Sequence, residues 1–306
     1  MNYSIVIVTY NRLDKLKKCI ENASNQNISA HHIIIINNAS TDGTTNFLGE
    51  ESFRQMPYVI VNMPENTGGA GGFAKGVEIA RQLRDDWVLL IDDDAMLKKD
   101  YVEEILKNKD SDVLAYSGSV LEADKLSLYH RRRVRLSPTY AEVDVSVDEY
   151  KKEYFDYDLS SFCGLFISMN LINKIGLPKR DFFIWYDDTE YSLRIREHSA
   201  IRNINAAQLR HEIVVNQNGD VELHKMKWKD YYGLRNRLYT IKEHGTKISY
   251  IYEIIFLRLR WMKYFIWRII GTNDKKKIGQ YNSTLLSAAI KDGKNKKLMK
   301  NEKYLP

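Results

Sequence analysis

The sequence predicts an α/β fold built around a mostly parallel sheet. Short, continuous apolar runs at 4–8, 33–36, 58–62 and 87–91 are typical of strands buried on both faces. The segments 12–25 and 73–84 carry apolar residues at helical spacing and alternate with these runs. Strands that alternate with helices in this way predict parallel pairing.

Composition limits the protein to a few classes. The 306 residues are enough for one large α/β domain with an appendage or for two modest domains, and the hydrophobic share of 44% argues against wholesale disorder. Cys19 and Cys163 form no CxxC or His/Cys cluster, so we expect neither a disulfide framework nor structural zinc. SIVIV begins at residue 4 without signal-peptide features, and we expect a cytoplasmic protein.

Each of the first four predicted strands is followed by a polar cluster. The clusters are Thr9-Tyr10-Asn11, Asn37-Asn38, residues 64–72 and Asp92-Asp93-Asp94. Ligands bind outside the carboxyl ends of the strands in parallel sheets. The sequence therefore predicts a binding site at this edge.

The later elements are less regular. We expect further strands over 112–120, 162–169 and 201–210, and an aromatic strand at 182–186 that leads into a helix ending near 197. Residues 122–158 are expected to form a long excursion, the chain is helical from 226, and the last thirty residues form a loose basic tail. These features predict a domain over 1–225, with halves 1–95 and 96–225, and a helical region over 226–306.

The segment 248–270 is strongly apolar but carries five charges, which argues against a transmembrane helix. Four of the five, all except Arg258, fall within a sector of roughly 140° on a helix. An amphipathic helix that lies on a membrane or a partner fits this pattern better.

The aspartates that follow WVLLI indicate a metal site. Alternate residues of an extended chain point the same way, so Asp92 and Asp94 are expected to share a cavity while Asp93 faces elsewhere. Carboxylates crowded at a strand end need a cation, and oxygen ligands suit Mg²⁺ or Mn²⁺. The alternative for this cluster is a solvated turn or a helix cap.

The sequence ENTGGAGGFAKG at 65–76 is a glycine-rich loop that leads into a helix. Its glycines allow the backbone to approach a ligand closely, and the helix offers free N–H groups to an anion. It matches neither the dinucleotide nor the Walker pattern. A plain flexible turn is the alternative.

WYDDTEY at 185–191 places Asp187, Asp188 and Glu190 at a helix start, where they act either as caps or as a general base. His211 follows the strand predicted over 201–210, and without further context a structural role is the more frequent one.

Together these motifs resemble the GT-A fold glycosyltransferases of family 2, over roughly residues 3–240. The resemblance implies an α/β GT-A domain in which the first two loops and the glycine loop bind the nucleotide sugar. The implied donor-binding residues are Thr9, Tyr10, Asn11, Arg12, Asn37, Asn38, Asn66, Gly68, Gly69, Gly72, Asp92 and Asp93. A divalent metal, Mn²⁺ or Mg²⁺, is implied on Asp92 and Asp94.

Within the family, NTGGAGGF, the tandem aspartates and the downstream histidine are most similar to galactofuranosyltransferases, with rhamnosyltransferase-like members close by. This implies that Asp188 is the catalytic base and that His211 is a metal ligand. The implied acceptor-binding residues are Asp187, Glu190, Phe162, Cys163, Gly164 and Trp185. Asn37-Asn38 departs from the aspartate usual in the second loop, and Phe162-Cys163 replaces the paired tryptophans.

We therefore expect an inverting transferase that uses a nucleotide-diphosphate sugar, with UDP-galactofuranose as the leading donor and dTDP-rhamnose as the alternative. The expected acceptor is a glycan or a lipid-linked oligosaccharide, at the inner face of the cell membrane. A silent sugar-nucleotide-binding module and a nucleotidyltransferase are the rivals. The basic patch Arg131–Arg135 raises nucleic-acid binding, which we do not expect because the usual binding motifs are missing from the sequence.

Overall fold

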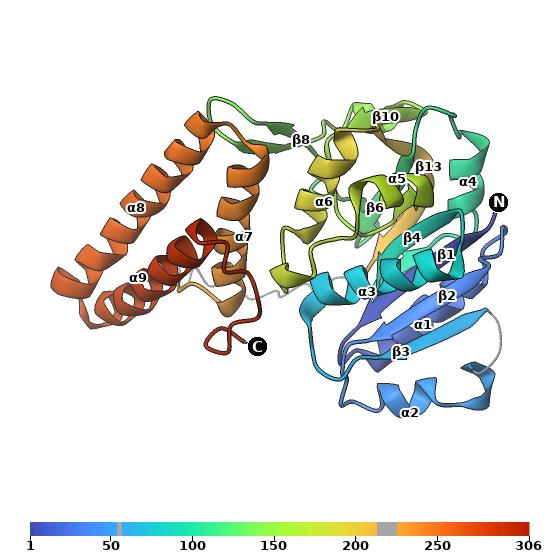
Figure 1. The fold of residues 1–306 in the computed structure, drawn as a ribbon, viewed down its shortest axis with the longest axis horizontal. Coiled ribbons are helices and arrows are strands. Elements are labelled where there is room, and N and C mark those ends of the chain that lie inside the picture. Colours follow the sequence, from blue (N-terminus) through green and yellow to red (C-terminus); the bar gives the residue numbers. More distant parts are fainter. Residues whose placement is uncertain (54–56, 213–224, 306) are drawn as a thin grey trace. The chain divides into compact units, whose positions relative to one another are not determined.

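The computed structural model describes residues 1–53, 57–212 and 225–305. The chain divides into two compact units (Figure 1). The first comprises residues 1–133, 143–180 and 188–213, and the second comprises residues 134–142, 181–187 and 214–306.

Strands and helices alternate through the first half of the chain, as the sequence predicts. The strands are β1 (Tyr3–Thr9), β2 (His32–Asn37), β3 (Tyr58–Asn62), β4 (Trp87–Asp92), β5 (Ala95–Leu97), β6 (Ala115–Glu122), β7 (Lys125–Leu126), β8 (Arg131–Arg135), β9 (Ala141–Asp144), β10 (Tyr154–Tyr157), β11 (Leu159–Ser160), β12 (Leu165–Ser168) and β13 (Ile201–His211). The α-helices are α1 (Leu13–Ser24), α2 (Thr44–Leu48), α3 (Gly68–Leu83), α4 (Tyr101–Lys107), α5 (Met169–Ile175), α6 (Asp187–Arg196), α7 (Trp228–His244), α8 (Lys247–Ile270) and α9 (Asn273–Lys294).

The main sheet lies in the first unit, with the strand order β10-β13-β6-β12-β4-β1-β2-β3. Strand β1 pairs in parallel with β2 and β4, and β2 pairs in parallel with β3. Strand β12 is antiparallel to both β4 and β6, while β13 runs parallel to β6. The carboxyl ends of β1, β2, β4, β6 and β13 therefore share one edge of the sheet.

The alternation of side chains along the buried strands builds a core on each face of this sheet. Ile5 and Ile7 of β1 belong to one cluster together with Leu16 of α1. Val6 and Val8 point the other way and pack in a second cluster with Phe73 of α3. The sheet is thus covered on both faces, which explains the continuous apolar runs.

Helix α3 begins at Gly68, so the expected start at residue 73 is wrong. The glycine-rich segment is the first part of the helix. A side chain at Gly72 would overlap Val8 of β1, so this glycine lets α3 approach the sheet closely.

The aromatic strand expected at 182–186 is also wrong. A 3₁₀ turn covers Arg180–Phe182, and Phe183, Trp185 and Tyr186 have φ values of 65°, 64° and 71°. The Asn236 amide of α7 holds this backbone by donating to the carbonyl oxygens of Phe182, Ile184 and Trp185 at 3.0, 3.1 and 2.8 Å. The buried Asn236 amide, together with Arg235 Nη2, which also donates to the Phe182 carbonyl oxygen at 3.0 Å, therefore satisfies this backbone in place of a neighbouring strand.

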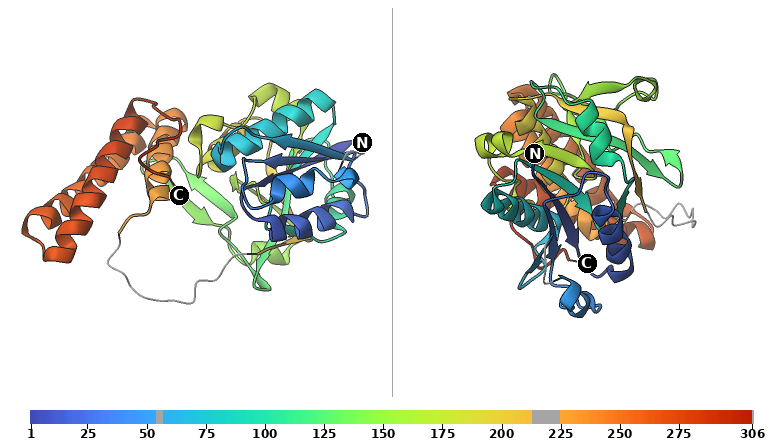
Figure 2. Two further views of the ribbon diagram at one scale, coloured as in Figure 1. Left: turned by 90° about the horizontal axis from the view of Figure 1, so that it is seen from below. Right: turned by 90° about the vertical axis from the view of Figure 1, so that its right-hand side faces the viewer.

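The loose tail expected at the end of the chain is wrong for most of its length. Helix α9 continues to Lys294 and buries Leu285, Leu286 and Ala289 in the second unit. Helices α8 and α9 lie side by side (Figures 1 and 2). Gly279 permits this contact, because a side chain there would come within 2.6 Å of the α8 backbone.

Helix α8 confirms the amphipathic helix expected over 248–270. Within the described residues, no helix is both long enough and apolar enough to cross a membrane. The expected excursion over 122–158 contains short strands, β7 to β10.

Candidate functional site

Strand register brings residues from distant parts of the sequence to one edge of the main sheet. Thr9 is paired with Asn37, and Val8 with Asp92. At the end of β13, His211 is paired with Ala95, and the Glu212 N–H donates to the Asp94 carbonyl oxygen at 2.8 Å. The predicted polar clusters of β1, β2 and β4 and the histidine of β13 therefore meet at this edge.

The three consecutive aspartates have different surroundings. Strand β4 ends at Asp92, and Asp93 and Asp94 form a turn, so the expected alternation stops there. Arg12 Nη1 contacts Asp93 Oδ1 at 3.1 Å and Asp94 Oδ2 at 2.8 Å, so these two carboxylates share a partner. The buried Asp93 also accepts a hydrogen bond from Thr9 Oγ1 at 2.7 Å, which ties the β1 loop to β4.

Asp92 is the aspartate without a compensating contact. Its carboxylate makes no hydrogen bond or ion pair with another side chain in the described part of the chain. Burial and the neighbouring charge of Asp94 raise the pKa of Asp92 to about 7. A cation bound beside Asp92 would remove this repulsion and favour the ionised carboxylate.

The pKa of Asp94 is shifted in the opposite direction, below its usual value. Burial alone would raise its pKa, but His211 and the cations Arg12 and Lys15 outweigh burial and hold the pKa of Asp94 at about 2. Lys15 Nζ lies 3.2 Å from Asp94 Oδ2. The side of Asp94 that carries Oδ2 is thus covered by cations, while Oδ1 faces His211.

His211 lies between two carboxylates. Its Nε2 is 3.2 Å from Asp94 Oδ1, and its Nδ1 is 2.8 Å from Glu122 Oε1. Burial lowers the pKa of His211, but the hydrogen bonds with Asp94 and Glu122 outweigh burial and raise this pKa to about 9. Without a metal the imidazole is therefore protonated at neutral pH.

The residues at this edge fit a divalent cation. Asp94 Oδ1 and His211 Nε2, 3.2 Å apart, form a direct ion pair, and a cation bound by both atoms would take the place of the His211 proton between them. Carboxylate oxygens with one imidazole suit Mg²⁺ or Mn²⁺, and binding would release the His211 proton.

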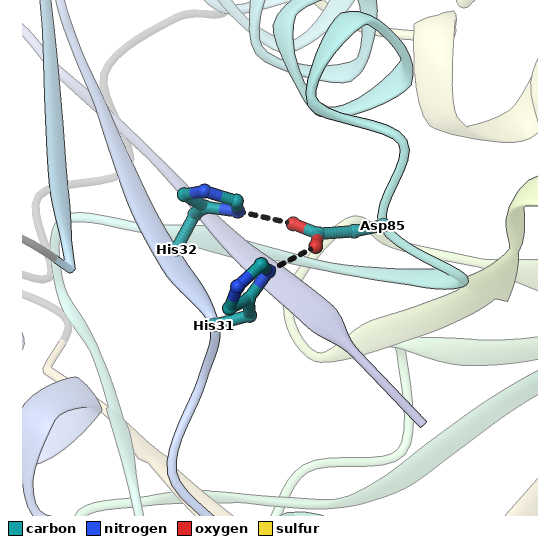
Figure 3. A group of neighbouring side chains, drawn as sticks. All are labelled: His31, His32 and Asp85. Atoms are coloured by element: carbon teal, nitrogen blue, oxygen red, sulfur yellow. Dashed lines mark hydrogen bonds and ion pairs between the residues drawn. The ribbon is translucent and has the colours of Figure 1, made fainter.

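In the described residues, three ligand-type side chains come within 4.8 Å of one another at two places, and neither group includes Asp92 or Asp94. The first group is Glu122, His130 and His211, and His211 also contacts Asp94. The second group is His31, His32 and Asp85, near the amino ends of β2 and β4 and therefore at the opposite end of the strands (Figure 3). There Asp85 accepts from His31 Nδ1 at 2.7 Å and from His32 Nδ1 at 2.6 Å.

Asn37 and Asn38 are at the predicted edge, but their amides are used inside the protein. Asn37 donates to Thr45 Oγ1 at 2.9 Å and to Asn62 Oδ1 at 2.8 Å. Asn38 donates to Asn66 Oδ1 and the Gly68 carbonyl oxygen and accepts from the Thr67 N–H and hydroxyl. Both donor positions of each amide are filled, which favours a role in joining the loops over recognition of a base.

Some glycines of the glycine-rich segment pack against the sheet, while another faces open space. Gly72 contacts β1, as described above, whereas a side chain at Gly69 would meet no atom within 4 Å. Asn66 Oδ1 accepts from the Gly68 N–H at 2.8 Å at the start of α3. Gly69, one of the predicted donor-binding residues, therefore leaves room for a ligand.

The first loop is partly ordered by side-chain contacts. Asn11 has a φ of 53°, and its Oδ1 accepts from the Thr41 N–H at 2.7 Å. Tyr10 is exposed beside it. The loops after β1 and β2 are therefore joined, and an aromatic ring remains accessible.

Phe162, Cys163 and Gly164 are all buried. The Phe162 ring centroid is 4.8 Å from that of Phe73, and the Cys163 carbonyl oxygen accepts from Arg131 Nη2 at 3.1 Å. Burial raises the pKa of the Cys163 thiol well above its usual value, which agrees with the prediction that it is not a nucleophile. Because Phe162 and Cys163 are buried, direct contact of either side chain with an acceptor would need a rearrangement.

The tandem aspartates fall at the start of α6. Asp188 Oδ1 accepts from the Thr189 N–H at 2.6 Å, which fixes the carboxylate. Glu190 is buried and forms an ion pair with Arg194 at 2.8 Å, which argues against the expected acceptor contact. Trp185 and Asp187 belong to the second unit.

Glu122 and Lys15 were missed by the sequence analysis. Glu122 ends a strand that runs parallel to β4, so it occupies the position in β6 that Asp92 occupies in β4. A search for polar residues at every strand end, extended to 122, would have found it. Lys15 has no such signal, because one lysine on an exposed helix face is ordinary.

Comparison with known proteins identifies the same region. The profile of "Glycosyl transferase family 2" matches residues 4–169, which is more than half of the chain. The chain is 31% identical over 107 residues to "Uncharacterized glycosyltransferase YwdF" of Bacillus subtilis, covering 35% of this chain and 38% of that protein.

Two named transferases align over longer segments. "Galactofuranosyltransferase GlfT1" of Mycobacterium tuberculosis is 27% identical over 197 residues, covering 62% of this chain and 63% of that protein. "dTDP-rhamnosyl transferase RfbF" of Shigella flexneri is 21% identical over 206 residues, covering 66% of each. The chain spans about two fifths to two thirds of the length of these relatives.

Solved structures share the fold. The structure titled "GalNAc-T7 with UDP, GalNAc and Mn2+" superposes with a TM-score of 0.61 at 11% identity, covering 79% of this chain and 48% of that one. S. aureus TarS 1–349 in complex with UDP-GlcNAc superposes with a TM-score of 0.57 at 12% identity, covering 94% and 82%. The expected GT-A fold is thereby confirmed, and with the profile match the chain belongs to glycosyl transferase family 2.

Proposed function

We propose that the protein is an inverting, divalent-metal-dependent glycosyltransferase that moves a sugar from a nucleotide diphosphate to an acceptor hydroxyl. The observation that carries the proposal is the contact of Asp94 Oδ1 with His211 Nε2 at 3.2 Å, at the carboxyl edge of the sheet where the buried Asp92 also lies. This set combines hard oxygen ligands with one imidazole, as a cation that binds diphosphate requires.

The residues of the chain take distinct roles in the proposed reaction. Asp92, Asp94 and His211 would hold Mn²⁺ or Mg²⁺, which when bound supplies Lewis-acid stabilisation of the leaving diphosphate. The Gly68 N–H is already bound by Asn66, so the N–H groups that follow it in the first turn of α3, beginning at the open position Gly69, would bind the donor. Asp188, held by Thr189, takes the proton of the acceptor hydroxyl as its oxygen attacks the anomeric carbon from the face opposite the nucleotide.

For the sugar we propose galactofuranose, carried by UDP, because NTGGAGGF, the tandem aspartates and the downstream histidine resemble the galactofuranosyltransferases of the family. The named galactofuranosyltransferase supports this choice, while the dTDP-rhamnosyl transferase, at comparable coverage, makes dTDP-rhamnose the alternative. A catalytically silent sugar-nucleotide-binding module is the second alternative.

The test is donor hydrolysis and thermal shift with a panel of nucleotide sugars, with and without Mn²⁺. The panel contains UDP-galactofuranose, UDP-galactopyranose, UDP-glucose and dTDP-rhamnose. We expect metal-dependent stabilisation and slow hydrolysis with UDP-galactofuranose. A response to dTDP-rhamnose alone would identify rhamnose, and not galactofuranose, as the transferred sugar. Stabilisation without hydrolysis or transfer would favour the binding module. No response to any donor or to UDP would overturn the proposal.

We also propose that helix α8 binds the anionic face of a membrane, where a lipid-linked acceptor would be available. Its outer face exposes large apolar side chains, including Ile255, Phe256, Leu259, Met262 and Ile266. A groove of about 600 Å³ beside them is lined by Arg258 of α8 and by Lys291 and Lys294 of α9, with no acidic side chain. This combination is complementary to anionic lipid, whereas a second copy of the chain would bring like charges together.

Sedimentation with vesicles tests this surface. We expect the protein to sediment with phosphatidylcholine vesicles that contain phosphatidylglycerol, and less with phosphatidylcholine alone. Leu259→Glu should weaken sedimentation, and Gln280→Glu, which adds the same charge to an exposed position of α9, should not. Equal sedimentation of all three proteins, or a dimer by light scattering that Leu259→Glu abolishes, would contradict the membrane assignment.

A further inference from the structure

We infer that Glu122 is a positioning residue that orients His211 for metal binding. This inference rests on the proposed metal-dependent function, and it adds a residue that lies outside the sequence motifs. Glu122 contacts the Nδ1 side of the His211 ring, whereas Asp94 contacts the Nε2 side. Glu122 acts through the ring of His211.

The contact that carries the inference joins the two nitrogens of one imidazole to two different carboxylates. His211 Nδ1 is 2.8 Å from Glu122 Oε1, while Nε2, on the other side of the ring, is 3.2 Å from Asp94 Oδ1. A proton held on Nδ1 by Glu122 leaves the Nε2 lone pair for the cation. Metal-ligating histidines commonly have such a carboxylate on the second nitrogen, where it fixes the tautomer and the ring orientation.

Glu122 is itself held in place by neighbouring side chains. Its Oε1 also accepts from the Tyr129 hydroxyl at 3.0 Å and from His130 Nε2 at 3.2 Å. His130 is buried, and its other nitrogen is 2.8 Å from Ser161 Oγ. The carboxylate therefore has its position fixed before a ligand enters, as a preorganised metal site requires.

The backbone explains why Glu122 reaches His211. Strands β6 and β13 run in parallel, and Leu121 is paired with Arg210. The next residue of each strand is Glu122 and His211, and both are the last residues of their strands. The contact is thus fixed by strand register rather than by a long flexible loop.

The experiment measures Mn²⁺ binding by calorimetry and the His211 tautomer by NMR of ¹⁵N-histidine-labelled protein with and without Mg²⁺. The proteins are wild type, Glu122→Gln, Glu122→Met and His211→Gln, which also assigns the His211 signals. Glutamine retains an acceptor for the Nδ1 proton, whereas methionine has similar length and offers none. Asp124→Asn is the matched control, because it removes an exposed carboxylate from the adjacent β6–β7 turn.

We expect Glu122→Met to weaken Mn²⁺ binding by about 10- to 100-fold and to lose the single Nδ1–H tautomer. Glu122→Gln should retain that tautomer and lose less affinity, and Asp124→Asn should match wild type. If His211→Gln abolishes Mn²⁺ binding while Glu122→Met binds normally, the role of Glu122 is overturned and the metal site stands. If wild type binds no Mn²⁺, the metal-dependent function fails, and the inference about Glu122 fails with it.

Discussion

At the scale of single residues, the three neighbouring aspartates of one motif have different surroundings because their partners differ. Asp93 joins β1 to β4 through Thr9, and Asp94 is neutralised by Arg12 and Lys15. The pKa of Asp92 is raised to about 7 by burial and by the charge of Asp94. We therefore expect Asp92 and Asp94 to respond to a cation, whereas Asp93 serves mainly the fold.

The proposed general base is also tested at this scale. Asp188→Asn keeps the shape of the side chain but removes its ability to take a proton, so turnover should fall by roughly 10²–10⁴ while donor affinity is retained. Steady-state kinetics together with UDP binding separate the two effects. The surface control Asp148→Asn should behave as wild type, and an Asp188→Asn enzyme with normal turnover would exclude Asp188 as the base.

At the scale of elements, helix α3 shows how packing and ligand access divide the glycines of one segment. Gly72→Ala should destabilise the protein by about 1–3 kcal/mol, because the new methyl group overlaps Val8 of β1. Gly69→Ala has open space, so it should be neutral or stabilising by up to about 1 kcal/mol while it raises the KM for the donor. Urea unfolding and donor kinetics check this pair, and equal stability of the two variants would contradict the packing described for α3.

The sequence alone predicted those strands and helices whose pattern of apolar residues follows the burial of their side chains. Ile33–Ile36 lies in a strand buried on both faces, and the pattern over 248–270 gives α8. Helix α9 was missed because lysines and glycines obscure the apolar positions Leu285, Leu286 and Ala289. The aromatic run at 182–186 was misread because its conformation depends on Asn236, a residue some fifty positions away that no local pattern includes.

Part of the candidate site was also predictable from the sequence. Strand ends in a parallel sheet meet at one edge, so the place of the aspartates at the end of β4 was predictable from the sequence, whereas the interest in His211, the last residue of β13, came from the resemblance to the family. The inward orientation of Asn37 and Asn38 was not predictable, because it depends on Thr45, Asn62 and the Thr67 loop. The same holds for Glu122, whose partner His211 is 89 residues away in the sequence.

At the scale of the whole molecule, Asp85 joins the amino ends of β1, β2 and β4 through hydrogen bonds to its carboxylate. We expect the stability of the fold to depend on pH through the ionisation of this carboxylate. Burial would raise the pKa of Asp85, but hydrogen bonds from Ser4, His31 and His32 outweigh burial and lower it (Figure 3). A carboxylate whose pKa is lower in the folded protein stabilises the fold above its unfolded pKa of about 3.9. This contribution is lost as the pH falls through the lower folded value.

We therefore expect Asp85→Asn to be less stable than wild type at pH 7, with the difference shrinking below about pH 4. Thermal unfolding from pH 7 to pH 3 measures the difference, with Asp148→Asn as the surface control. A gap between wild type and Asp85→Asn that stays constant over this range would show that the ionisation of Asp85 does not contribute.

The central claim is that Asp92, Asp94 and His211 form one site in which a divalent cation joins the protein to a nucleotide diphosphate. The most direct measurement is the affinity for UDP by calorimetry with and without Mn²⁺, in wild type and in Asp92→Asn. We expect Mn²⁺ to strengthen UDP binding by at least tenfold in wild type, and this gain to vanish in Asp92→Asn. UDP binding that is independent of Mn²⁺ in wild type, or an unchanged gain in Asp92→Asn, would contradict the account.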